Sequence, residues 1–282
     1  MTPQQPFTAA VPAPAHHRSP AKPLPALLAS LGITASLLGA APALAADASA
    51  SVQVTGISFQ ASNGLTLSWL AGSSFQSLFA ESREAGGLGG NQLQEPAPGS
   101  SWSNQTVSTA MAHASAGAQA TAGGLLSAQA DASRHEVDPL ISQPHTGASW
   151  AQQSGAFTLS GAGQLTIVVS YTLSVGAPLS DGNDSWAGAS LGLSAGNLDS
   201  GATGGGEVAL WSFELPTGTA SRSGSLSYLV DLAGAQETGY YDLRANANVS
   251  ATAAVPEPGS WALMALGLAT LGALARRRQR GA

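Results

Sequence analysis

A group of side chains able to bind a metal lies near the middle of the chain. Carboxylates and imidazoles at short spacing are the ligand types that bind Zn²⁺ and related divalent ions. The group consists of Asp131, His135, Glu136, Asp138 and His145. Pro139 and Pro144 interrupt the same segment, and in a chain with only 9% charged residues an exposed loop would collect charge in the same way. The sequence therefore leaves two interpretations open, a metal site and a solvated loop.

A second candidate site is the acidic turn at residues 181–184, which has the sequence Asp-Gly-Asn-Asp. Asp181, Asn183 and Asp184 offer the oxygen ligands that Ca²⁺ prefers, although the full spacing and the terminal glutamate of an EF-hand are missing. An Asx turn, in which the side-chain oxygen binds a nearby backbone N–H, explains the same residues. Calcium is thus a candidate cofactor at this turn, and nothing in the sequence requires one.

Catalysis would need paired side chains, and the spacing selects no pair. Glycoside hydrolysis uses two carboxyl groups that flank the scissile bond, for which Glu207 with Glu214, or Asp231 with Asp242, are the candidates. The chain has no P-loop and no H-E-x-x-H motif, and we expect no nucleophile elbow of the G-x-S-x-G type. It also has no cysteine, which excludes thiol catalysis. We expect no catalytic residue and no enzymatic activity.

The candidate residues are distributed over segments in which apolar and polar residues alternate. A period of two is typical of β-strands with one buried face. Residues 46–254 contain about nine to eleven such segments, separated by turn-forming residues, and no long amphipathic helix. The pattern predicts an all-β fold, an antiparallel β-sandwich that is jelly-roll-like.

Local signals refine this prediction. The alternation changes phase at Gly56, which indicates a β-bulge in one long strand. Asn63-Gly64 is a strong signal for a two-residue hairpin. Residues 81–103 are rich in glycine, proline and serine and predict a long loop, whereas residues 105–120 fit a strand or, because alanine favours helix, a helical segment.

The large aromatic residues have two potential roles in such a sandwich. Trp69, Trp186 and Trp211, with the phenylalanines, are expected to supply most of the bulk buried between the sheets. The alternative is that tryptophans on one exposed sheet face stack on sugar rings.

Residues 1–45 have the features of a secretory signal peptide. An apolar segment at residues 24–41 is broken by Pro42, and the small residues Ala43 and Ala45 then form a small-x-small cleavage pattern. We expect cleavage after Ala45, and an uncleaved N-terminal anchor is the alternative.

Three features follow one another in residues 255–282. The first is Pro256-Glu257-Pro258, whose prolines favour an extended, accessible backbone. The second is the uncharged segment 260–275, which as a helix would span ~24 Å, short of a hydrocarbon core about 30 Å thick. The third is the basic cluster Arg276, Arg277, Arg278 and Arg280. Since positive charge beside a membrane span stays cytoplasmic, the preceding domain is expected outside.

This order of prolines, apolar span and arginines resembles the PEP-CTERM sorting signal of exported proteins in Gram-negative bacteria. The resemblance covers residues 255–280, with Pro256-Glu257-Pro258 as the motif itself. It implies recognition by an exosortase, a membrane transpeptidase-like enzyme, with removal of the tail near the motif. It also implies an association with exopolysaccharide and biofilm. A plain C-terminal anchor with a proline-rich stalk is the alternative.

These observations lead to an expected location and set of partners. We expect the inner membrane to hold residues 260–275 transiently, and the protein to end at the cell surface or outside the cell. The expected partners are the secretion machinery, an exosortase and exopolysaccharide. Nucleic acid is excluded, because residues 46–254 contain 15 acidic residues, four arginines and no lysine. A surface carbohydrate-binding module or a glycan-active hydrolase is the alternative function.

Overall fold

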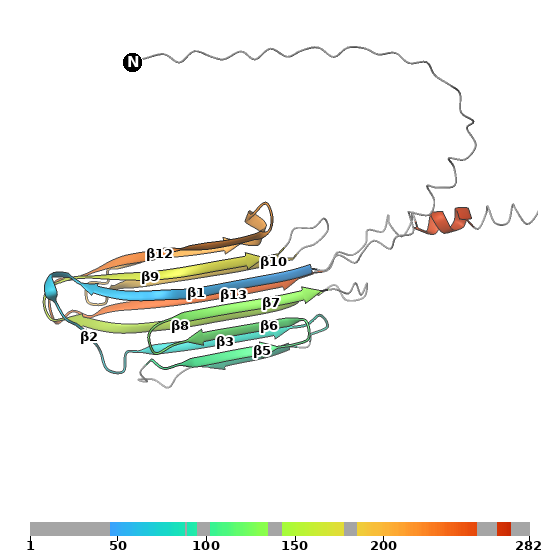
Figure 1. The fold of residues 1–282 in the computed structure, drawn as a ribbon. Coiled ribbons are helices and arrows are strands. Elements are labelled where there is room, and N and C mark those ends of the chain that lie inside the picture. The colour runs from blue at the N-terminus through green and yellow to red at the C-terminus, as the bar shows by residue number, and fades with distance from the viewer. Residues whose placement is uncertain are drawn as a thin grey trace, which may run out of the picture. The chain divides into compact units, whose positions relative to one another are not determined.

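The computed structural model describes residues 46–87, 89–94, 102–134, 143–177, 185–252 and 264–271. All of these residues lie within Ala43–Ala282. The described residues form two β-sheets in which all strand pairs are antiparallel (Figure 1). The predicted all-β antiparallel sandwich is therefore confirmed.

One sheet has six strands, in the spatial order β12-β9-β1-β7-β6-β5. Its members are β12 (Thr219–Leu232), β9 (Gly163–Gly176), β1 (Ala46–Ala61), β7 (Leu126–Arg134), β6 (Ala114–Ala120) and β5 (Gln105–Ala110). The long strand β1 thus lies in the interior of its sheet, between β9 and β7.

The other sheet has seven strands, six of them in the order β11-β10-β13-β8-β3-β4, and β2 pairs separately with β8. Its members are β11 (Thr203–Trp211), β10 (Trp186–Asn197), β13 (Gly239–Ala251), β8 (His145–Leu159), β3 (Phe75–Arg83), β4 (Gly89–Gln94) and β2 (Leu67–Trp69). Short 3-10 helices follow β1 at Ser62–Gly64 and β11 at Ser212–Glu214. The sheets pack face to face, with β7 against β8 and β13 and with β1 against β13.

The core follows from the alternation that the sequence shows. On β13 the odd positions from Tyr241 to Ala251 face inward and are buried, while the even positions face outward. Much of the inward face of both sheets is alanine, on β6, β7, β10 and β13. Most of the remainder is leucine, valine and isoleucine, together with Phe157, Tyr171 and Tyr241, so the two sheets are joined mainly by small and branched aliphatic side chains.

A chain of buried polar groups crosses this apolar core. Gln153 is 1% exposed, donates from Nε2 to the Tyr241 hydroxyl at 2.9 Å and accepts from Gln76 Nε2 at 3.1 Å. Gln76, 2% exposed, also donates to the Thr121 carbonyl, and its Oε1 accepts from the Ser103 N–H. Burial raises the pKa of Tyr241 strongly, so its hydroxyl stays protonated.

Two of the local predictions concern β1 and have opposite outcomes. The pairing of β1 with β9 shifts register between Val54 and Gly56, which confirms the bulge. The hairpin at Asn63-Gly64 is wrong, because the chain crosses to the other sheet and β2 pairs with β8. The Ser62 hydroxyl accepts from the Gln164 N–H at 3.0 Å, which attaches this crossing to the start of β9.

Other predictions need correction in the middle of the chain. Residues 81–103 were expected to form a loop, yet they include the end of β3 and all of β4. Residues 105–120 form two paired strands, β5 and β6, so the helical alternative is wrong. The tryptophans do not fill the space between the sheets: Trp69 is 36% exposed, and Trp186 and Trp211 are only partly buried.

The first strand of the sandwich starts at the same end of the sheets at which the last strand finishes. Figure 1 shows that the start of β1 and the end of β13 lie at one end of the two sheets. Both strands are in the interior of their sheets, β1 between β9 and β7 and β13 between β10 and β8.

Candidate functional site

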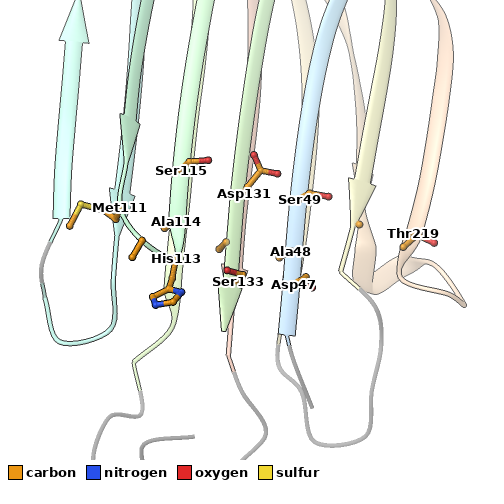
Figure 2. A pocket seen from close by; sticks show the side chains of 13 residues that line it. Asp47, Ala48, Ser49, Met111, His113, Ala114, Ser115, Asp131, Ser133 and Thr219 are labelled. Atoms are coloured by element: carbon orange, nitrogen blue, oxygen red, sulfur yellow. The ribbon is translucent and has the colours of Figure 1, made fainter. Parts of the chain in front are cut away.

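A shallow pocket of about 500 Å³ lies on the outer face of the six-stranded sheet, where β1 begins. Figure 2 shows Ser115, Asp131 and Ser49 side by side on β6, β7 and β1. The strand register places Asp131 directly opposite both serines. Asp47, His113 and Thr219 also line the pocket.

Asp131 is the main functional group of this pocket. Burial raises the pKa of its carboxyl above the ordinary 3.8, and a hydrogen bond with Ser115 opposes the rise. A carboxylate between two hydroxyl groups is a hydrogen-bond acceptor for a ligand that carries hydroxyls. The pocket is open to solvent, and its serine hydroxyls and the Asp131 carboxylate are groups that can hydrogen-bond to a ligand.

The predicted metal ligands are only partly covered by the described residues. Asp131 lies on the outer face of β7, whereas His145 begins β8 in the other sheet and packs its ring 5.2 Å from the ring of His113. Within the described ranges no group of three or more metal-ligating side chains is brought together. His135, Glu136 and Asp138 lie outside those ranges, so metal binding by this segment stays a prediction.

The surroundings of His145 disfavour the charged form of its imidazole. Burial lowers the pKa of its imidazole below the ordinary 6.5, and the positive charges of His113 and Arg134 lower it further, while Glu84 opposes them. Its Nδ1 is buried and makes no hydrogen bond within the described part of the chain. The predicted calcium ligands Asp181, Asn183 and Asp184 lie outside the described residues.

The structure brings neither pair of candidate carboxylates together. Asp231 lies on β12 and accepts from Gln164 Nε2 at 2.7 Å, whereas Asp242 lies on β13 in the other sheet and accepts from Gln152 Nε2 at 2.6 Å. Glu207 lies on β11, and Glu214 lies in the 3-10 helix that follows it. The strand from residue 207 to residue 211 already covers ~13 Å at ~3.3 Å per residue.

The letters of the nucleophile-elbow motif do occur, in strand β10. Residues 188–192 and 192–196 both have the spacing G-x-S-x-G, which corrects the expectation that the sequence lacks it. A working elbow places its serine on a sharp turn between a strand and a helix. Ser190 and Ser194 instead lie within a continuous strand, paired on both sides with β11 and β13. The motif here is a by-product of alternating glycine and serine.

A cluster of aromatic residues that the sequence predicts to be buried lies on the outer face of the seven-stranded sheet. Trp211 lies 6.2 Å from Trp186 and 5.7 Å from Phe213 between ring centroids, and Phe213 is 62% exposed. The signal that could have placed Trp211 outward is the alternation of inward and outward residues along β11. Val208 and Leu210 mark the inward positions of β11, so Trp211 falls on the opposite face.

The sorting segment is mostly outside the described residues, which include neither Pro256, Glu257, Pro258 nor the arginines Arg276, Arg277, Arg278 and Arg280. The predicted signal-peptide residues Ala43 and Ala45 lie outside them as well. Residues 264–271 form a helix within the predicted span 260–275, and this helix is short and not a clear membrane span. Over the described ranges, no helix combines the length and apolar character needed to cross a bilayer.

Comparison with known proteins identifies the C-terminal segment alone. Residues 254–279 match the family model of the PEP-CTERM protein-sorting motif. No curated protein matches the chain, and no solved structure matches it. The match begins three residues after β13 ends at Ala251, so the sandwich is complete before the motif starts. The chain therefore carries a PEP-CTERM protein-sorting motif at residues 254–279, which supports a PEP-CTERM domain-containing protein that is exported and sorted by an exosortase.

Proposed function

We propose that this chain is a non-enzymatic protein of the cell surface or extracellular matrix that associates with exopolysaccharide. The observation that carries the proposal is the sorting motif at residues 254–279, directly behind a complete β-sandwich. In this proposal residues 260–275 hold the chain in the inner membrane until the exosortase acts. Removal of the tail then frees a folded domain, because no strand is lost.

The arrangement of charged groups supports a role without catalysis. The four candidate carboxylates lie on separate elements, and each of Asp231 and Asp242 is hydrogen-bonded to a glutamine rather than facing a partner acid. The shallow pocket at Asp131 offers serine hydroxyls and a carboxylate on the outer face of the six-stranded sheet, an arrangement suited to contacts with polyhydroxyl chains.

Intact-protein mass spectrometry of the native protein tests the processing step. We expect the protein in the medium or on the cell surface to end near residues 255–258, with or without an added group, while the membrane fraction holds the full tail. A native protein whose mass extends to Ala282 and which stays in the membrane fraction would overturn the proposal and make residues 255–282 an ordinary anchor.

A carbohydrate-binding module is the second candidate, and the exposed aromatic cluster at Trp211 is the observation that favours it. A carbohydrate array with the purified protein separates the candidates. Selective binding supports the module, and turnover of a glycan supports a hydrolase. If the protein neither binds nor cleaves a glycan on the array, the first candidate, a non-enzymatic matrix protein, is favoured.

A further inference from the structure

The indole of Trp211 lies against the outer surface of its sheet. A methyl group built at Gly188, the residue opposite Trp211 on β10, would come within 2.1 Å of the indole Cζ3 and 2.3 Å of Cε3. The indole therefore occupies the space that a side chain at position 188 would take, and it covers that backbone. Phe213 continues the aromatic surface with its ring plane at 27° to the indole, and the ring of Trp186 lies at 47° to the indole.

Polar groups lie next to this aromatic surface at fixed positions. Asn248 pairs with Gly188 on the side away from Trp211, and its side-chain amide makes no hydrogen bond to any residue in the described part of the chain. Asn246, two residues before Asn248 on β13, donates to the Ser190 hydroxyl at 3.3 Å and accepts from Arg244 Nε at 3.0 Å. Arg244 in turn stacks over the ring of Trp150 at 4.9 Å.

The surroundings of the aromatic surface define what it can bind. An exposed ring offers its face to the C–H groups of a flat, saturated ring, and a neighbouring free amide both donates to and accepts from hydroxyl groups. Beyond Ser190, a side chain added at Gly192 would meet nothing within 4 Å, so a chain could pass along β10 without obstruction. The domain carries 15 acidic residues against four arginines, and this balance opposes a polyanion.

We propose that Trp211, Phe213 and Trp186 form a stacking surface for the pyranose rings of an uncharged polysaccharide, with the Asn248 amide binding its hydroxyls. This inference rests on the proposed association with exopolysaccharide and develops the second candidate above, since it names the surface through which the protein would bind a polysaccharide. Asn246, Arg244 and Trp150 are positioning residues that keep the polar row on β13 in place. The Asp131 pocket, on the opposite sheet, is not part of this surface.

Affinity electrophoresis tests the surface with defined probes. The exported protein, purified from cells that process it, is run in native gels that contain a soluble β-glucan, a galactomannan or, as an anionic counter-probe, alginate. We expect retardation by at least one uncharged polymer and none by alginate. Phe213→Ala and Trp211→Ala should each raise the dissociation constant obtained from that retardation roughly tenfold, because each removes one ring of the stacking surface.

Two controls make the result interpretable. Leu229→Ala is the matched variant, because Leu229 is 44% exposed on the other sheet and its loss should leave retardation unchanged. Phe213 is so exposed that its replacement does not disturb the core, and thermal unfolding of each variant checks this. Sedimentation velocity shows whether the aromatic surface instead joins two copies of the chain.

The outcomes separate this inference from the proposed function. The surface is refuted if Phe213→Ala and Trp211→Ala bind the glycans as the unaltered protein does, if only alginate binds, or if the variants turn a dimer into a monomer. Co-fractionation with the polysaccharide of the producing cells gives the second readout. If all variants still co-fractionate, the matrix role stands and the surface is elsewhere. If the correctly processed, unaltered protein does not co-fractionate, the matrix role itself fails.

Discussion

Replacement of Gln153 by alanine is the sharpest test of how this sandwich is held together. Gln152 and Gln153 are adjacent, chemically identical residues on β8, yet only Gln153 points into the core, where it is 1% exposed. Gln152 points outward and binds Asp242 at 2.6 Å. A one-residue slip in the register of β8 would exchange the two roles.

The expected cost of Gln153→Ala follows from its contacts. The substitution removes two buried hydrogen bonds, one to the Tyr241 hydroxyl and one from Gln76 Nε2, each with a net value of ~1 kcal/mol. It also leaves the Tyr241 hydroxyl without that donor and opens a small cavity. Together these effects give about 2–4 kcal/mol in the free energy of unfolding. Gln152→Ala removes one partly exposed bond and should cost less than ~1 kcal/mol.

Urea unfolding followed by tryptophan fluorescence measures both values in the same buffer. We expect the midpoint of Gln153→Ala to fall well below that of Gln152→Ala with an unchanged m-value. Equal midpoints, or a larger loss for Gln152→Ala, would refute the assignment of the buried face of β8. Such a result would also remove the polar chain from Gln76 to Tyr241 as a stabilising feature.

Three further predictions concern other parts of the chain. Because the pKa of His145 lies below its unfolded value of 6.5, stability associated with this residue is complete above about pH 6.5 and is lost as the pH falls towards the folded pKa. Urea midpoints between pH 8 and pH 5 should therefore fall less steeply for His145→Gln than for the unaltered protein. Gly239→Ala should cost about 1–3 kcal/mol, since its new methyl would come within 2.3 Å of the buried Phe157 ring. At Gly192 an added methyl group would meet nothing within 4 Å, so Gly192→Ala should leave the free energy of unfolding nearly unchanged. Thermal melts of the two variants measure this difference. Replacing both Pro256 and Pro258 by alanine should leave the tail attached, and a cleaved product of normal mass would show that the prolines are dispensable.

The sequence predicts the class of fold because alternation records which face of each strand is buried. It even predicts the bulge in β1, since the change of phase at Gly56 is the same event as the register shift that the structure shows. It does not predict which strands pair. Asn63-Gly64 is a hairpin signal by type, but Ser62 is hydrogen-bonded to the backbone N–H of Gln164, a contact 102 positions away that no local pattern contains.

The candidate site was harder to predict for a related reason. Residue type suggests that tryptophan is buried, and only the phase of β11 relative to Val208 places Trp211 outward. The approach of its indole to Gly188 depends on the pairing of β11 with β10. Likewise, Ser49, Asp131 and Ser115 meet because β1, β7 and β6 are neighbours, although their sequence positions are far apart.

The interior position of β13 has a mechanical consequence for the stage at which the C-terminal tail still holds the domain at the membrane. A pull on the tail enters the fold at the end of β13, along the direction of that strand. Almost the full length of β13 is hydrogen-bonded to β10 on one side and to β8 on the other, with bonds perpendicular to the strand. Such a load acts on both ladders in shear rather than opening them one bond at a time. The sandwich is thus built to resist traction from the end that carries its sorting segment.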